Sequence, residues 1–116
     1  MRSGQPDYLP DLLRGNTEAL LLFLVNEMDY TYGYQLIKEI GRRSEGILRF
    51  KEGTIYPALR KLENEGLLRG QWQQTSNGQE RRYYRITAKG KTVLETKLAA
   101  WESFSNAINL VFRTAG

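Results

Sequence analysis

The sequence predicts a mainly α-helical chain with one small β-hairpin, an α+β arrangement. Three observations carry this prediction. Apolar residues recur at helical spacing in three segments before residue 65, two strand-like segments then flank an Asn-Gly pair, and a last long segment returns to helical spacing. With 116 residues, of which 41% are hydrophobic, the chain is sized for one modest domain with an appended helix.

The composition excludes several classes of function. There is no cysteine, so disulfides and thiolate metal sites are excluded and a cytoplasmic location is favoured. There is also no histidine, the commonest general base and metal ligand, and we find no carboxylate pair at useful spacing, Gly-rich phosphate loop or ligand-spaced cluster. We therefore expect no enzyme, no cofactor and no metal site.

The N-terminal region predicts an arm followed by an apolar helix. Residues 1–9 are rich in turn-forming residues, and Pro10 suits a first helical turn. The apolar pattern then predicts a helix from about Asp11 through Gly15 to Met28. Its longest apolar run, residues 19–25, is far below the roughly 20 residues that cross a bilayer, so we expect no membrane span. The helix has more apolar surface than one face needs, which predicts a partner for part of it.

A second, shorter helix is predicted from Tyr34 to about Arg43, after a short connection. Its N-terminus could bind a phosphate through backbone amides, helped by the hydroxyl of Tyr32 or Tyr34. The alternative is that these tyrosines only pack on the surface. Residues 47–50 form a brief extended piece that could pair with the sheet.

The third predicted helix has the character of a DNA-reading helix. Ile55, Leu59 and Leu62 form its apolar stripe, while Pro57 is tolerated only near the front of a helix and places the start at Glu52 or Gly53. Gly66 suits its C-terminal cap. The opposite face is polar and basic, which is typical of a recognition helix, although a solvated surface helix has the same pattern.

A β-hairpin follows this helix. Residues 67–74 and 81–86 predict two strands, joined by the turn cluster at 75–79 that contains Asn77 and Gly78. Between Lys38 and Lys91 there are 13 basic and 6 acidic residues, a net charge of +7, whereas the whole chain carries +4. Three helices followed by a hairpin, with the positive charge in the middle of the chain, predict a winged helix-turn-helix that meets a polyanion. The hairpin is its wing, although a charged hairpin alone is also compatible with a solvated edge.

The last helix is predicted from Ala88, capped by Thr87, to about Arg113. A coiled-coil spacing runs along it, with a second apolar row beside it, and one small domain cannot bury both. We therefore expect a homodimer through this helix and the partner's first helix. The predicted dimer residues are Leu94, Leu98, Trp101, Phe104, Ile108 and Phe112. The predicted division is an arm at 1–9, a DNA-binding domain at 10–86 and a dimerisation helix at 87–116.

A dimer of this kind would present two recognition helices to successive major grooves of double-stranded DNA, so we expect an inverted-repeat operator. Base contacts are predicted for Thr54, Tyr56 and Pro57. Phosphate contacts are predicted for Tyr34, Lys51, Arg60 and Lys61, and wing contacts for Gln79, Arg81 and Arg82. The alternative is a winged-helix protein-interaction module without DNA or ligand function.

Two segments, residues 53–68 and 81–90, resemble the signature of PadR-type transcriptional regulators, and residues 32–36 fit the same pattern. The chain is similar to the short subgroup with a single C-terminal helix. This resemblance implies a dimeric repressor, and Trp101 falls where multidrug-binding members carry a tryptophan that stacks on flat aromatic ligands. The implied ligand-binding residues are Leu12, Ala19, Val93, Leu94, Lys97, Leu98, Trp101 and Ser105.

The ligand pocket departs from that pattern in two places. Lys97 puts a charge on the pocket wall, and Ser105 offers no carboxylate to a cationic drug. The alternative is that Trp101 and Phe104 are dimer-core residues without a ligand.

Overall fold

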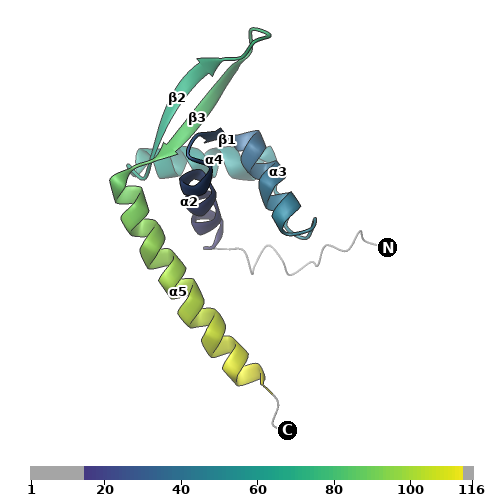
Figure 1. The fold of residues 1–116 in the computed structure, drawn as a ribbon, viewed down its shortest axis with the longest axis vertical. Helices are drawn as coiled ribbons and strands as arrows, with labels where there is room; N and C mark the ends of the chain where they lie inside the picture. Colours follow the sequence, from purple (N-terminus) through teal and green to yellow (C-terminus); the bar gives the residue numbers. More distant parts are fainter. Residues whose placement is uncertain (1–14, 114–116) are drawn as a thin grey trace.

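The computed structural model describes residues 15–113. Within that range, four helices and a three-stranded antiparallel sheet confirm the predicted fold class (Figure 1). In chain order the elements are α2 (Thr17–Met28), β1 (Thr31–Tyr32), α3 (Gly33–Arg43), α4 (Glu52–Asn64), β2 (Leu68–Gln74), β3 (Glu80–Ile86) and α5 (Ala88–Phe112). The hairpin of β2 and β3 projects from one side of the helical core, and α5 extends from the other (Figure 1).

The core lies where α2, α3 and α4 meet the base of the hairpin. The predicted stripe of α4 is confirmed, because Ile55, Leu59 and Leu62 are all buried. The other buried hydrophobic residues are Leu21, Leu22, Leu24, Val25, Leu36, Ile40, Leu67, Leu68, Tyr84 and Leu94. This cluster fixes α4 against the rest of the domain and leaves its polar face outside.

The first described helix begins later than predicted. The prediction that this helix runs through Gly15 is wrong, because Gly15 has a φ of +85° and α2 starts at Thr17. A left-handed glycine ends or precedes a right-handed helix and cannot continue it. The expected arm at 1–9 and the predicted helix start at Asp11 lie outside the described residues.

The third strand of the sheet comes from a different segment than expected. Residues 47–50 do not pair with the sheet. Instead Thr31 and Tyr32 pair with Tyr84 and Tyr83 of β3, where only a connection was predicted. Leu48 and Phe50 pack against the core, and the Leu48 amide donates to Ser44 Oγ at 2.9 Å. The segment thus satisfies its backbone locally and uses its apolar side chains for packing.

Both ends of α4 follow the prediction. The helix begins at Glu52, so Pro57, which has no N–H to donate, lies in its second turn. At the other end Gly66 has a φ of +77°, its amide donates to the Glu63 carbonyl, and the Leu67 amide donates to the Leu62 carbonyl. These two bonds form a Schellman motif, which stops α4 and turns the chain into β2.

The hairpin and the last helix were also predicted closely. The turn closes through the Thr75 amide, which donates to the Gln79 carbonyl at 2.6 Å, and Gly78 has a φ of +86°. The Thr87 hydroxyl accepts from the Gly90 amide at 2.9 Å, which confirms the predicted cap of α5.

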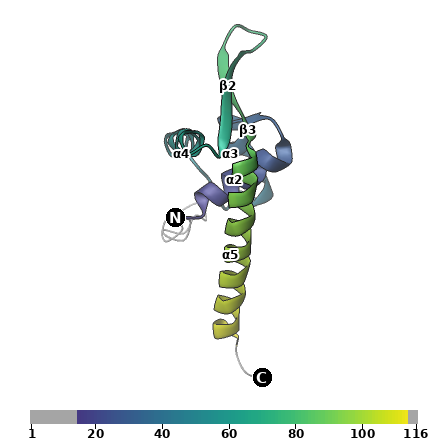
Figure 2. The same ribbon diagram turned by 90° about the vertical axis from the view of Figure 1, so that its left-hand side faces the viewer.

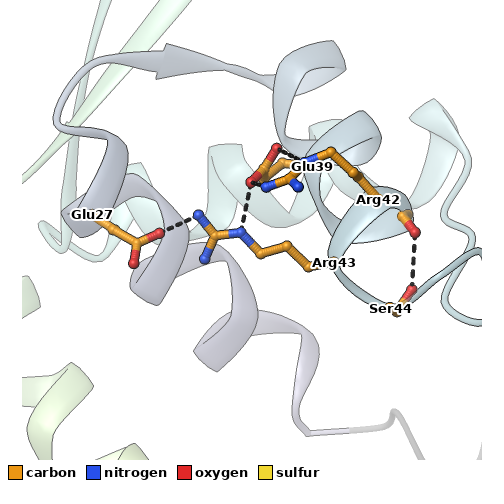
Figure 3. Close-up of polar contacts among 6 residues, drawn as sticks. Glu27, Glu39, Arg42, Arg43 and Ser44 are labelled. Atoms are coloured by element: carbon orange, nitrogen blue, oxygen red, sulfur yellow. Dashed lines mark hydrogen bonds and ion pairs between the residues drawn. The ribbon is translucent and has the colours of Figure 1, made fainter.

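An ion-pair network joins α2 to α3 (Figure 3). Arg42 and Arg43 both bind the Glu39 carboxylate, with shortest nitrogen–oxygen distances of 2.6 Å, and Arg43 also contacts Glu27 of α2. The hydrogen bonds from Arg42 and then Arg43 lower the pKa of Glu39 to about 2. These two arginines contribute to the positive charge of the middle segment, but in this surface network their charges are paired with those of Glu39 and Glu27.

None of the helices in residues 15–113 is long and apolar enough to span a membrane. The same residues hold no group of three or more acidic, histidine or cysteine side chains that could hold a metal ion.

Candidate nucleic-acid interface

A groove of about 730 Å³ lies between α4, the wing and the N-terminus of α3. Figure 2 shows α4 nearly along its axis, with the hairpin rising beside it. The groove is lined by polar, charged and aromatic side chains. They are Tyr32, Tyr34, Glu52, Tyr56, Arg60, Glu63, Asn64, Trp72, Glu80, Arg81, Arg82 and Tyr84, together with Gly33 and Leu59.

The front of α4 presents its predicted reading residues to solvent. Lys51, Thr54, Pro57 and Arg60 are all exposed. Because the core stripe holds the other side of α4, the side chains of Thr54, Pro57 and Arg60 project outward from its first three turns, just after Lys51 at the N-cap.

Tyr56 has a structural contact as well as an exposed surface. A Cβ atom built on Gly33 would lie 2.2 Å from Cε1 of the Tyr56 ring, so only glycine allows the ring to pack here. The Tyr56 hydroxyl donates to Glu52 at 3.3 Å, and burial raises the pKa of Tyr56 above its ordinary value. Tyr56 is 39% exposed, so it fixes α4 against α3 and still offers one edge to the groove.

At the start of α3, two tyrosines lie beside cations. Tyr34 is half exposed, with the Lys38 ammonium 5.5 Å from its ring centre. The Arg81 guanidinium of β3 lies 4.5 Å from the Tyr32 ring, and Tyr32 also packs edge-on against Tyr83. Such cation–π contacts orient the positive charges without neutralising them.

Two cations that were predicted to contact DNA form ion pairs with carboxylates of the protein. Lys61 lies 2.6 Å from Glu18 of α2 and 3.1 Å from Glu65, and it does not line the groove. The hydrogen bonds that the Lys61 ammonium donates to these carboxylates, foremost to Glu18, raise the pKa of Lys61. Arg82 lines the groove but contacts the Glu63 carboxylate of α4. Gln79 is exposed at the tip of the wing.

Sequence reasoning missed several residues of this groove. Trp72, which is 61% exposed, lies directly across the hairpin from Arg82. Counting back from the Asn77-Gly78 turn would have paired these two residues. By contrast, no local pattern marks Glu63, since it meets Arg82 from 19 positions away.

The residues predicted for a ligand pocket are spread over two environments. Leu12 lies outside the described residues. Leu94 is only 4% exposed and belongs to the core, while Val93 and Ala19 are partly buried. Lys97 lies 3.9 Å from Glu18.

Farther along α5 the side chains are open to solvent. Leu98 is 40% and Trp101 50% exposed, and the Trp101 ring centre lies 6.2 Å from that of Phe104. The Ser105 hydroxyl donates to the Glu102 carbonyl at 3.2 Å.

A core of helices that holds α4 beside a β-hairpin, with a groove of arginine, glutamate and aromatic side chains between them, defines a winged-helix DNA-binding protein. The sequence model of the transcriptional regulator PadR-like family matches residues 21–96, and the chain belongs to that family. It is therefore a DNA-binding transcriptional regulator and not an enzyme, as the sequence predicted.

The chain is also similar to individual proteins and solved structures. The chain is 33% identical over 100 residues to an uncharacterised protein of Lysinibacillus sphaericus, an alignment that spans 86% of this chain and 91% of the relative. A transcriptional regulator structure from Clostridium thermocellum superposes with a TM-score of 0.80 at 29% identity, covering 89% of this chain and 99% of the other. A PadR family regulator structure from Eggerthella lenta gives a TM-score of 0.76 at 32% identity, covering 92% and 90%.

Proposed function

We propose that the protein is a dimeric repressor that binds an inverted-repeat operator with α4 in the major groove. The groove between α4 and the wing carries this proposal, because Tyr56 and Arg60 of α4 line it together with Arg81 of the wing. Thr54 and Pro57 do not line the groove but are exposed on the same helix. Thr54, Tyr56 and Pro57 would contact base edges. Tyr34, Lys51, Arg60, Arg81 and Gln79 would contact the DNA backbone and so supply affinity without sequence information.

Dimerisation is supported by the apolar surface of α5. Its large side chains become more exposed toward the C-terminus, reaching 60% at Leu110, 77% at Val111 and 74% at Phe112. Exposed apolar surface of this kind marks an interaction site on a small protein. A second copy of the chain would cover it through α5 and the partner's N-terminal helix. We propose residues 10–86 as the DNA-binding domain and 87–116 as the dimerisation segment, acting in the cytoplasm.

The same helix supports a response to a flat aromatic ligand. Trp101 is half exposed next to Phe104, and two copies related by a twofold axis would bring two such pairs together. A ligand between them would release DNA only if it binds better to a dimer whose two α4 helices are wrongly spaced. The alternative is that both rings serve only the dimer core.

The experiment is a titration of the purified protein against DNA from its own promoter region, followed by fluorescence anisotropy at several salt concentrations. The expected result is binding that weakens steeply with salt and that is much tighter on an inverted repeat than on scrambled DNA. Binding that ignores the sequence would contradict the operator proposal.

The phosphate contacts are tested by Arg81→Gln, which should weaken binding to operator and scrambled DNA alike. Arg69→Gln is a matched control, since Arg69 is an exposed arginine of the same hairpin that does not line the groove. A loss confined to the operator would mean that Arg81 reads sequence.

The ligand is tested by repeating the titration with a planar cationic dye. A dye that weakens operator binding and quenches tryptophan fluorescence would support the pocket. Trp101→Ala should then abolish the quenching, once the background emission of Trp72 has been subtracted. Unchanged dye affinity in Trp101→Ala would remove this residue from the site.

A further inference from the structure

A carboxylate lies inside the groove that is proposed to receive DNA. Glu63, in the last turns of α4, accepts from Arg82 of β3: Arg82 Nε lies 3.2 Å from Glu63 Oε1, and Arg82 Nη2 contacts Glu63 Oε2. This two-point geometry is the strong form of an arginine–carboxylate pair. The hydrogen bond that Arg82 donates to Glu63 raises the pKa of Arg82.

The space for this pair is left by a glycine. Gly70 of β2 lies below it, and a Cβ atom at this position would lie 2.7 Å from Arg82 Nε and 2.8 Å from Glu63 Oε1. The Arg82 guanidinium also lies 5.3 Å from the ring centre of Trp72. The two side chains are 28% and 24% exposed, so the pair is partly enclosed between the wing and α4.

A negative charge in a DNA-binding groove repels phosphate, so Glu63 by itself would weaken binding. Its position is explained by the contact it makes, because Glu63 and Arg82 join the end of the recognition helix to the wing. Glu80 provides a contrast within the same groove, since it is an exposed carboxylate without an ion pair to any described residue.

We propose that Glu63 and Arg82 are positioning residues that clamp the wing to the recognition helix and set the width of the DNA-binding groove. In this assignment, which rests on the proposed DNA binding, Arg82 does not serve as a phosphate contact. The clamp holds the wing at the angle at which α4 and Arg81 reach the operator together, so it contributes to operator affinity through geometry.

The sign of the effect separates the clamp from simple electrostatics. Glu63→Gln removes a negative charge from the groove. If electrostatic repulsion of phosphate were the only effect, the variant would bind DNA more tightly. The clamp predicts the opposite, an operator affinity lower by about fivefold, while affinity for scrambled DNA is unchanged or slightly higher. The matched control Glu80→Gln should tighten binding to both DNAs. Tighter operator binding by Glu63→Gln, equal to that of the control, would overturn the proposal.

Three further variants complete the test. Arg82→Gln should reproduce the operator loss of Glu63→Gln, and the double variant should lose no more than either single one, as expected for one shared contact. The slope of affinity against salt should stay the same in Arg82→Gln. A slope smaller by about one charge would instead make Arg82 a phosphate contact. Gly70→Ala crowds the pair without changing any charge, and it should give the same loss.

A measurement without DNA keeps the clamp separate from the proposed function. In a Trp101→Phe background, Trp72 is the remaining tryptophan and reports on the wing. Glu63→Gln should lower the steady-state fluorescence anisotropy of Trp72 in the free protein, because the wing gains motion, and Glu80→Gln should not. If the wild type binds no DNA while this change is seen, the clamp stands and the DNA proposal fails. An unchanged anisotropy in Glu63→Gln would refute the clamp.

Discussion

Most leucine side chains in the winged-helix part of the chain are buried, whereas leucine and aromatic side chains on the distal half of α5 are exposed. Leu21, Leu22 and Leu36 have no exposed surface, whereas Trp101 and Phe104 are at least half exposed and Phe112 is 74% exposed. The first region completes a core within one chain. The second region has the residues of a core but not the second layer that would cover them, which is the reason for proposing a dimer through α5.

The largest expected effect tests this contrast on leucines in the two regions. Leu22→Ala should lower the free energy of unfolding by about 3 kcal/mol, because it leaves a cavity in a filled core. Leu110→Ala should cost less than about 0.5 kcal/mol at low protein concentration, where α5 is not covered. Urea unfolding of both variants at the same concentration measures the difference. Equal losses would mean that the distal half of α5 is packed within a single chain.

A smaller effect is expected where the two regions join. A Cβ atom at Gly90 would lie 2.1 Å from the Leu67 carbonyl oxygen, against which the first turn of α5 packs. Gly90→Ala should therefore cost about 2 kcal/mol, as overpacking commonly does. Thermal unfolding followed by circular dichroism would show it. Gly53→Ala, where the added Cβ meets nothing within 4 Å, is the control. Similar melting temperatures for the two variants would contradict the tight junction.

The cap of α5 predicts a still smaller change. The Thr87 hydroxyl accepts from the Gly90 amide and donates to the Gly66 carbonyl at 2.7 Å. Thr87→Val keeps the shape and removes both bonds, so a loss of about 1 kcal/mol is expected in chemical denaturation. Thr92→Val, one turn later on an exposed part of the helix, should change little. If both variants behave alike, Thr87 does not cap α5 in solution.

The smallest effect concerns charge within the winged-helix region. The pKa of Glu39 is lowered from 4.5 to about 2 by Arg42 and Arg43. A lowered folded-state pKa contributes stability that is complete above pH 4.5 and is lost as the pH falls toward 2. Glu39→Gln should therefore lose less stability than the wild type between pH 5 and pH 3 in urea unfolding. The Glu39 carboxyl is on the surface, so the difference should be slight. A wild-type loss no greater than that of the variant would rule out this contribution.

Periodicity and turn chemistry predicted most of the fold. The stripe at Ile55, Leu59 and Leu62, the cap at Gly66 and the hairpin turn at Asn77-Gly78 are local signals, and the structure has each of them. The strand at residues 31–32 was missed because it is two residues long and depends on β3, more than 50 positions away. A pattern within one segment cannot report such a pairing.

The helix and hairpin that form the candidate site could be predicted from the sequence, but the ion pairs of its charged residues could not. The exposed front of α4 followed from the helix stripe alone. The environments of Lys61 and Arg82 did not, because Glu18 is 43 positions from Lys61 and Glu63 is 19 positions from Arg82. From the sequence, a cation that binds DNA and one that joins two helices look the same.

One consequence follows from how α5 is attached. Among its described residues only Gly90 and Leu94 are buried, and the Lys89 ammonium donates to the Glu65 carbonyl at the end of α4. The 18 residues beyond Leu94 form a rod of about 27 Å, so a tilt of about 5° at its base moves the tip by about 2 Å. In a twofold dimer, the opposite also holds: a displacement of about 2 Å between the two α5 helices would rotate each α4 by only about 5°. Ligands of different shape would then have the same effect on DNA binding whenever they separate the two α5 helices by the same distance.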